Sequence, residues 1–117
     1  MQNLIKAMKA LCDETRLRIL NILLEKEECC VCEIMQALDI SQTRASRNLG
    51  MLQDAGFLKS SRQGAWMFYS IDQQTANRYA TSLAQLLKDS PISNEVLEQD
   101  RERLKQAVRI GPKALRK

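Results

Sequence analysis

The sequence predicts a mainly α-helical domain with one small β-hairpin. Two observations support this fold class. Apolar residues recur at helical spacing in most segments, whereas the segment "FLKSSRQGAWMFYSI" carries two runs of aromatic and aliphatic residues around Gln63 and Gly64. Glycine takes the positive φ that a tight hairpin turn needs. At 117 residues, the chain has room for one compact domain.

Two helices are expected in the first 28 residues of the chain. The stretch "NLIKAMKAL" has apolar residues at helical spacing, so it predicts a short amphipathic helix whose apolar stripe needs a partner. The next stretch, "CDETRLRILNILLEKEE", begins with Asp13 as an N-cap and carries a broad apolar surface. It therefore predicts the central helix of the core.

The following two segments predict a helix-turn-helix. "CCVCEIMQALD" predicts a short helix that ends near Asp39 and has its apolar residues on one face. "QTRASRNLGMLQDAG" predicts a second helix, with Ser41 as N-cap and Gly56 as the glycine that follows its carboxyl end. Two short helices joined by a brief turn are typical of this DNA-binding motif.

The remaining segments complete a winged helix-turn-helix. Residues 73–88 return to helical spacing after the hairpin. A thin apolar stripe through Leu97 and Leu104 predicts a further helix that is exposed or packed on a partner. We expect residues 1–90 to form the DNA-binding and dimerisation domain, and residues 91–117 to form a C-terminal helical extension with a basic tail.

Charge and composition favour a polyanionic partner and argue against an enzyme. The net charge is +4, and the segment from residue 41 to residue 66 contains four Lys and Arg residues but only one Asp. The chain has no histidine for general base chemistry, no phosphate-binding glycine loop and no carboxylate pair in an identifiable pocket. Without an apolar stretch of membrane-spanning length or a secretory leader, we expect a cytoplasmic protein with no membrane partner.

The second helix of the motif has a polar, cationic face opposite its buried stripe. Arginine binds guanine edges or phosphates, and the hairpin tip is placed to reach the minor groove or phosphate. Gly50 costs this helix about 1 kcal/mol relative to alanine, which suggests that DNA or another helix approaches it closely. The alternative is an ordinary solvated face. The predicted DNA-binding residues are Ser41, Gln42, Thr43, Arg44, Ser46, Arg47, Arg62 and Gln63.

Three of the four cysteines lie within "KEECCVCEI". In a reducing cytosol such a cluster indicates metal-binding or redox chemistry, or small packing residues. On a regular helix Cys30 and Cys32 are separated by about 200° and face away from each other, whereas Cys29 and Cys32 share a face. We therefore expect a ligand shared by Cys30 and Cys32 to distort the first turn of that helix.

Three stretches, "DETRLRIL", "CVCEIMQALDISQTRASRNLGMLQDAGFL" and "RQGAWMFYSI", resemble the ArsR/SmtB family of metal-responsive transcriptional repressors. The resemblance runs from about Leu11 to Ile71 and implies a homodimer that binds double-stranded operator DNA and releases it when a toxic metal or metalloid binds. "CVCE" resembles the motif of the arsenite-responsive subgroup. This implies Cys30 and Cys32 as ligands, As(III) or Sb(III) as the inducer, and no constitutive cofactor.

Two positions depart from the family pattern. The subgroup's third cysteine falls on Met35, and Asn48 stands where the family often has histidine. Because the chain has no histidine, the interfacial zinc or cobalt sites of other members do not carry over. We expect Cys29 to supply the third sulfur. The alternatives are Cys12, the weaker thioether of Met35, or no third sulfur.

Other readings of the cysteines and of the fold stay open. The main alternative is a redox- or persulfide-responsive repressor of the same fold, followed by a Cd(II)- or Pb(II)-type sensor and by a protein-interaction module that binds no DNA. A Cys₄ zinc site is disfavoured because the chain has only one C-x₂-C pair. The residues expected at the dimer interface, which alternatively fill the monomer core, are Leu4, Met8, Tyr79, Leu83 and Leu86.

Overall fold

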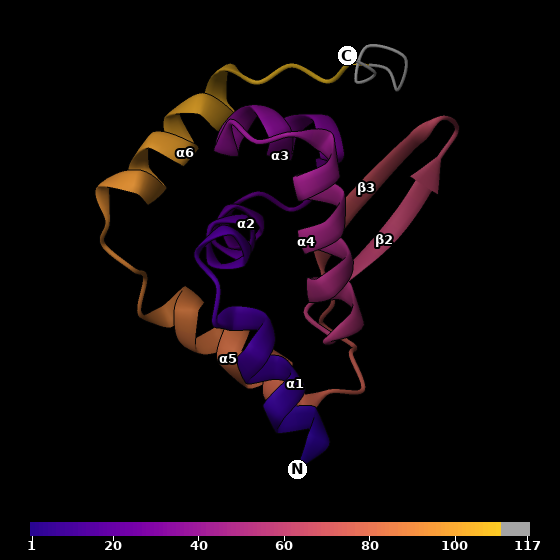
Figure 1. Ribbon diagram of the computed structural model, residues 1–117, viewed down its shortest axis with the longest axis vertical. Coiled ribbons are helices and arrows are strands. Elements are labelled where there is room, and N and C mark those ends of the chain that lie inside the picture. The colour runs from indigo at the N-terminus through magenta and orange to yellow at the C-terminus, as the bar shows by residue number, and fades with distance from the viewer. Residues whose placement is uncertain (111–117) are drawn as a thin grey trace.

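The computed structural model describes residues 1–110 and confirms a mainly helical fold with a small sheet (Figure 1). No helix within these residues is both long and apolar enough to cross a membrane. The elements in chain order are α1 (Gln2–Leu11), α2 (Glu14–Glu25), β1 (Cys29–Cys30), α3 (Val31–Leu38), α4 (Gln42–Asp54), β2 (Leu58–Gln63), β3 (Trp66–Ile71), α5 (Arg78–Asp89) and α6 (Glu95–Gln106).

The core forms around α2, as the sequence predicts. This helix is seen end-on in the middle of Figure 1, with the other helices and the hairpin arranged around it. Its residues Ile19, Leu20 and Ile22 are fully buried. The Asp13 carboxylate accepts a 3.0 Å hydrogen bond from the Arg16 amide, which confirms the predicted N-cap.

The helix-turn-helix consists of α3, a turn with Asp39 in the left-handed region, and α4. The Ser41 hydroxyl accepts a 3.2 Å hydrogen bond from the Arg44 amide and caps α4 as expected. Gly56 follows the carboxyl end of α4 with φ +93, and a Cβ there would lie 2.6 Å from the Thr75 hydroxyl oxygen. Only glycine fits this position without displacing its neighbours.

The sheet has one strand more than the sequence predicts. The expected hairpin is present as β2 and β3, and Gly64 takes φ +64 at its turn. In addition, β1 pairs antiparallel with β3, so that Cys29 lies opposite Tyr69 and Cys30 opposite Phe68. The strand order is β1-β3-β2. Because β1 takes up both cysteines, α3 begins at Val31 rather than at the cysteine pair.

Helix α5 begins later than predicted because polar side chains form turns over residues 72–77. The Asp72 carboxylate accepts from the Gln74 amide at 3.0 Å, and Asn77 Oδ1 accepts from the Tyr79 amide at 3.2 Å as N-cap of α5. The Asn77 amide Nδ2 also donates to the carbonyls of Asn3 at 3.0 Å and Ala55 at 2.9 Å. One buried side chain therefore joins α1, the end of α4 and the start of α5.

The last helix packs on its own chain, so the expectation that it is exposed or held by a partner is wrong for its inner face. Helix α6 lies against α2 and α3. Its Asp100 is fully buried and accepts hydrogen bonds from Arg18 at 2.8 and 2.9 Å and from Arg103 at 3.0 Å. The hydrogen bond to Asp100 raises the pKa of Arg18. The predicted basic tail at residues 111–117 lies outside the described residues.

Candidate DNA-binding surface and thiol site

Helix α4 divides into a buried face and an exposed polar face, as its sequence predicts. Ala45, Leu49 and Leu52 are fully buried and hold the helix against the core. The residues of this segment that we predicted to bind DNA are all exposed: Ser41, Gln42, Thr43, Arg44, Ser46 and Arg47.

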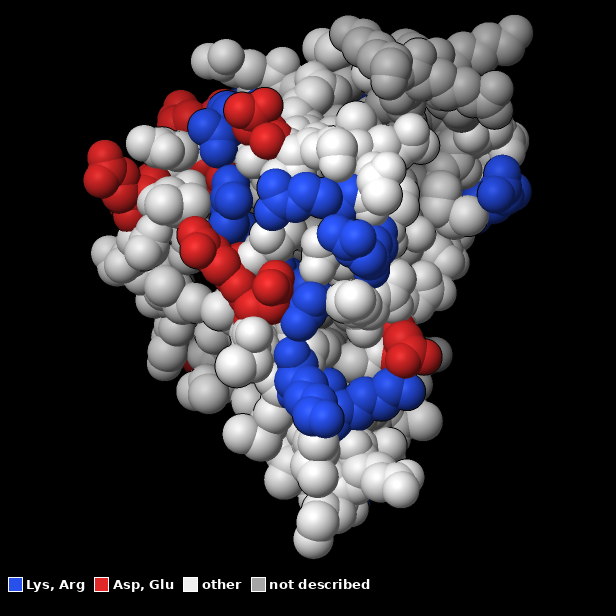
Figure 2. Space-filling model, viewed as in Figure 1, with Lys and Arg blue, Asp and Glu red and all other residues white. Residues whose placement is uncertain are grey.

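Positive charge gathers on the face that carries α4. In Figure 2, Lys and Arg side chains form a band down the middle of this face, whereas much of the acidic surface lies toward the side of α6. The Arg44 guanidinium donates to the Thr15 hydroxyl at 3.1 Å, which links the exposed face of α4 to α2. A cationic band of this kind attracts the phosphate backbone.

The hairpin, or wing, stands beside α4. Its Arg62 and Gln63 are both exposed at the end of β2 that is distant from the core, as expected for a second DNA contact. Gln53 donates to the Ser60 hydroxyl at 3.0 Å, so α4 and β2 are also joined by a side-chain hydrogen bond. The two predicted DNA-contacting elements are thus neighbours.

Asn48 has a structural role that the sequence analysis missed. It is buried, its Oδ1 accepts from Arg16 at 3.1 Å, and its Nδ2 donates to the Arg44 carbonyl at 2.8 Å. Arg16 also donates to the Ala10 carbonyl at the end of α1. Asn48 therefore helps to fix α4 against α2. The sequence did offer a signal, because Asn48 is a polar residue directly before Leu49, a member of the apolar stripe.

The structure brings Cys30 and Cys32 together, contrary to the expected geometry. Their Sγ atoms form a disulfide, and their Cα atoms are 5.3 Å apart. The helical spacing argument fails because Cys30 is the N-cap of α3 and has extended backbone, with φ −80 and ψ 163. Only Cys32 has helical geometry. The pair can therefore share a bond, or a ligand, while the first turn of α3 stays intact.

Cys29 does not join this pair. Adjacent residues of a strand point to opposite faces, and the Cys29 side chain lies in the main core, fully buried. Burial raises the pKa of its thiol to about 12, so it stays protonated at neutral pH. Cys12 is exposed at the end of α1. Within residues 1–110, no three Cys, His, Asp or Glu side chains gather as a metal site.

A separate apolar cluster surrounds Cys30 and Cys32. Both cysteines and Phe68 are buried in it, and Trp66 and Ile110 pack against them. The Trp66 and Phe68 rings stack with centroids 6.3 Å apart. This cluster lies where the first turn of α3 meets β3.

Residues 107–110, here called the C-terminal strap, run along α3 and contact this cluster. Gln36 binds both backbone groups of Val108, donating to its carbonyl at 2.6 Å and accepting from its amide at 3.1 Å. The Arg109 guanidinium lies 4.8 Å from the centre of the Phe68 ring. The strap therefore covers the cysteine pair from the side of α3.

Glu33 connects the strap to the cysteine pair. Its Oε1 accepts from the Cys30 amide at 3.1 Å and from Arg109 at 3.0 Å, and its Oε2 pairs with Lys26. Burial alone would raise the pKa of Glu33, but the hydrogen bonds from Lys26, the Cys30 amide and Arg109 outweigh burial and lower it. Glu33 is therefore an ionised carboxylate whose oxygens are already occupied.

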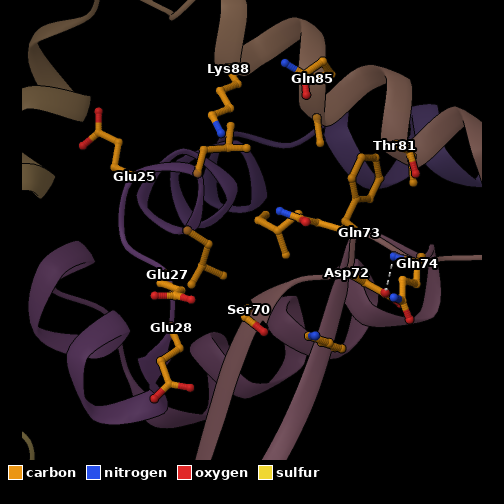
Figure 3. Close-up of a pocket in the computed structure, with 18 of the residues that line it drawn as sticks. Glu25, Glu27, Glu28, Ser70, Asp72, Gln73, Gln74, Thr81, Gln85 and Lys88 are labelled. Carbon is orange, nitrogen blue, oxygen red and sulfur yellow. Dashed lines mark hydrogen bonds between the residues drawn. The ribbon is translucent and has the colours of Figure 1, made fainter.

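A groove of the described chain lies elsewhere. It is open, has a volume of about 1120 Å³, and lies between the end of α2, the base of the wing and α5 (Figure 3). Glu27 and Glu28 line one side and Lys88 another, and Asp72 makes its hydrogen bond to Gln74 at the wing side. Neither Cys30 nor Cys32 is among its lining residues, and neither is the exposed face of α4.

Helices α1 and α5 pack side by side (Figure 1). Both carry exposed apolar side chains. Of the residues expected at a dimer interface, Met8, Tyr79 and Leu86 are 58%, 46% and 57% exposed. Leu4 and Leu83 are half-buried. Large exposed apolar side chains that gather on one face are typical of an interface with another protein.

Comparison with known proteins agrees with this geometry. The family described as "Bacterial regulatory protein, arsR family" matches residues 13–60. The chain is 45% identical over 67 residues to the "Arsenical resistance operon repressor" of Escherichia coli, an alignment that covers 57% of each protein. It is 43% identical over 63 residues to an uncharacterized HTH-type transcriptional regulator of Methanocaldococcus jannaschii, covering 54% of this chain and 71% of the relative.

A solved structure supports the same assignment. The homodimeric winged helix-turn-helix DNA-binding domain of a possible ArsR-family transcriptional regulator from Mycobacterium bovis matches with a TM-score of 0.61 and 30% identity. The match covers 76% of this chain and 81% of that domain. The helix order, the wing and these similarities lead to one conclusion: the chain belongs to the ArsR family of bacterial regulatory proteins and has its winged helix-turn-helix fold.

Proposed function

We propose that this protein is a homodimeric transcriptional repressor that binds operator DNA through α4 and the wing, and releases it when a thiophilic metalloid binds to Cys30 and Cys32. The observation that carries the proposal is the meeting of these two sulfurs at the start of α3, the helix that braces α4. The E. coli relative is named an arsenical resistance operon repressor, which favours As(III) or Sb(III) as the inducer.

The position of the pair supports a short route from ligand to DNA. Cys30 belongs to β1, which pairs with the wing strand β3, and Cys32 belongs to α3, which packs on α4. A ligand held by both sulfurs therefore fixes the wing relative to the helix-turn-helix. If it fixes them in an arrangement that does not fit the operator, the ligand binds the DNA-free form better and drives release.

This route differs from the one expected from the sequence. Unwinding the first turn of α3 is not needed, because Cys30 already lies outside the helix. The third sulfur expected from Cys29 is not part of the proposal either, because the Cys29 thiol points into the core.

Titration of operator-bound, reduced protein with thiophilic ions tests the proposal. Fluorescence anisotropy of labelled duplex DNA should fall on addition of arsenite or antimonite, with Cd(II) and Pb(II) as comparison ions. Cys30→Ser and Cys32→Ser should bind the operator normally and no longer respond. Cys12→Ser is the matched control and should respond like the unchanged protein. Release of operator DNA from Cys30→Ser by arsenite would contradict the proposal.

The disulfide favours a second candidate function, a thiol-based redox repressor. Two thiols that meet in this way can be oxidised by peroxide or by a persulfide donor, and the bond would join β1 to α3 as a metalloid would. Operator release by peroxide at concentrations where arsenite has no effect would select this candidate. A salt-dependent shift of duplex DNA is expected in either case.

A further inference from the structure

Arg16, in the first turn of α2, holds the end of α1 and the middle of α4 with one planar group. Its Nε donates to the Ala10 carbonyl at 2.6 Å and its Nη2 to the Lys9 carbonyl at 3.2 Å, so two nitrogens bind the carboxyl end of α1. The remaining nitrogen, Nη1, donates to Asn48 Oδ1 in α4 at 3.1 Å. Because the guanidinium is rigid and planar, these bonds fix the place of Asn48 relative to α1.

Asn48, the acceptor on α4, is held in one orientation. It is 7% exposed, and its Nδ2 donates to the Arg44 carbonyl one turn earlier at 2.8 Å. Reversing the side-chain amide would set donor against donor at Arg16 and acceptor against acceptor at the Arg44 carbonyl. The Thr15 hydroxyl accepts from the Arg44 guanidinium at 3.1 Å. Two adjacent residues of α2 therefore act on Arg44, one on its side chain and one, through Asn48, on its carbonyl.

The rotation of α4 about its own axis needs such directional bonds. The buried stripe of Ala45, Leu49 and Leu52 holds the helix against the core, but apolar attraction has no preferred direction, whereas a hydrogen bond weakens when its geometry changes. A helix is about 10 to 12 Å across with its side chains, so a rotation of about 10° moves a group on its surface by about 1 Å. A shift of that size exceeds the range of about 0.5 Å over which a hydrogen bond to a base keeps a good distance.

From these contacts we propose that Arg16 is a positioning residue for DNA recognition: through Asn48 it sets the rotation of α4, and thereby how strongly the protein distinguishes its operator from other DNA. This inference rests on the proposed function, in which α4 binds the operator. The Arg16 side chain is only 16% exposed and its nitrogens are bonded within the chain, so it acts through α4 and not by touching DNA.

The effect of Arg16 falls on specificity and not on overall affinity. Contacts to phosphates depend mainly on charge, whereas contacts to base edges depend on the exact place of each donor and acceptor. A rotated α4 therefore keeps its attraction for any duplex and loses part of its preference for one sequence.

The experiment measures the affinity of the full chain for two labelled duplexes. One is an operator sequence selected from a random pool by the unchanged protein, and the other is a scrambled sequence of the same length and composition. Arg16→Lys keeps the positive charge but has a single nitrogen, so it cannot bind α1 and Asn48 as the guanidinium does. The ratio of operator to scrambled affinity should fall by about tenfold, which is the discrimination of one good base contact, with the scrambled affinity kept within about twofold. An unchanged ratio would overturn the inference.

Arg18→Lys is the matched control. Arg18 lies on the same helix and its side chain is 15% exposed, against 16% for Arg16, but it donates to Asp100 and to the Leu38 carbonyl. This substitution should also lower the free energy of unfolding and should leave the affinity ratio unchanged, which separates positioning from stability. Equal falls of the ratio in both variants would show that the ratio follows stability and would overturn the inference.

A double-mutant cycle tests whether Arg16 acts through Asn48. Asn48→Ala removes the acceptor on α4 and should lower the affinity ratio at least as much as Arg16→Lys. The double variant should then bind both duplexes like Asn48→Ala alone, because both changes break the same hydrogen bond. Additive falls of the ratio would contradict the route through Asn48. Asn48→Ala also carries the test of positioning if Arg16→Lys does not fold.

The selection from the random pool distinguishes failure of this inference from failure of the proposed function. A protein that selects no sequence does not read DNA, which defeats the proposed function and the inference with it. A selected sequence whose preference is kept in Arg16→Lys but lost in Arg47→Ala leaves the proposed function standing and defeats the inference alone.

Discussion

Gly50 lies on the exposed face of α4, where a Cβ would meet no heavy atom of residues 1–110 within 4 Å beyond its local helix. Close approach by another helix of the described chain therefore does not explain this glycine. Gly50→Ala should raise the free energy of unfolding by about 1 kcal/mol, because alanine is the better helix former. Urea unfolding measures this effect. If the backbone at Gly50 approaches DNA, the same variant should also bind the operator more weakly.

Asp100 is a fully buried carboxylate between two guanidinium groups. Asp100→Ala leaves Arg18, whose side chain is 15% exposed, without its partner, and should lower the free energy of unfolding by about 3 to 5 kcal/mol. Glu102→Ala is the control on the same helix. Its pair with Lys105 is exposed, so the loss should be below about 1 kcal/mol. Equal losses in urea unfolding would contradict this account of Asp100.

The Cys29 thiol should make the protein less stable at alkaline pH. Its pKa is raised from 9.0 to about 12 in the folded chain, so the unfolded chain loses this proton first as the pH rises above 9.0. Stability then falls by up to about 1.4 kcal/mol per pH unit. Unfolding of Cys29→Ala measured from pH 8 to pH 11 should give a shallower decline. Burial also raises the pKa of Tyr69, which therefore adds to the loss of stability at alkaline pH. Because Tyr69 is present in both proteins, the comparison isolates the effect of Cys29.

Individual residues differ in how far the sequence predicts them. The N-caps Asp13 and Ser41 are predictable because a short polar side chain must bind the free amides of the first turn. The contact between Cys30 and Cys32 is not, because it depends on whether Cys30 is the first residue of α3 or the residue before it. A shift of one residue in a helix boundary reverses the conclusion.

Helix α4 should contribute most of the operator affinity. Its Arg47 is exposed opposite the buried stripe. If Arg47 binds phosphate, Arg47→Ala should weaken the binding of all DNA sequences alike and reduce the slope of log affinity against log salt concentration by about one. If Arg47 binds a guanine, the substitution should cost about 1 to 3 kcal/mol of binding free energy for the preferred sequence. Anisotropy titrations at several salt concentrations separate these cases. Lys105→Ala, which removes an exposed side chain of α6, should change neither the affinity nor its salt dependence.

Elements with a strong local signal are predicted well, and those set by tertiary pairing are not. The hairpin follows from Gly64 and its flanking runs, and α2 follows from its apolar surface. Strand β1 has only two residues and exists because β3 lies beside it, so no local pattern predicts it. The docking of α6 depends on Asp100 meeting Arg18, a residue 82 positions away.

The exposed apolar surface of α1 and α5 should hold two copies of the chain together. Leu86 is 57% exposed on this surface. Leu86→Glu places a charge there and should shift the protein from dimer to monomer and weaken operator binding, as measured by sedimentation and anisotropy. Gln106→Glu makes the same change in charge on α6 and should remain dimeric. A dimer that persists unchanged in Leu86→Glu would contradict this interface.

In such a dimer, Asn77 would connect the subunit contact to α4. Its single amide group grips α1 and the last turn of α4 from the start of α5, and the neighbouring Gly56 leaves no space between them. The helices expected at the subunit contact and the carboxyl end of α4 are thus joined through one buried side chain. In an assembled pair, a small tilt where the two copies meet would change the reach between their two DNA-reading helices, and with it the match to successive turns of the double helix.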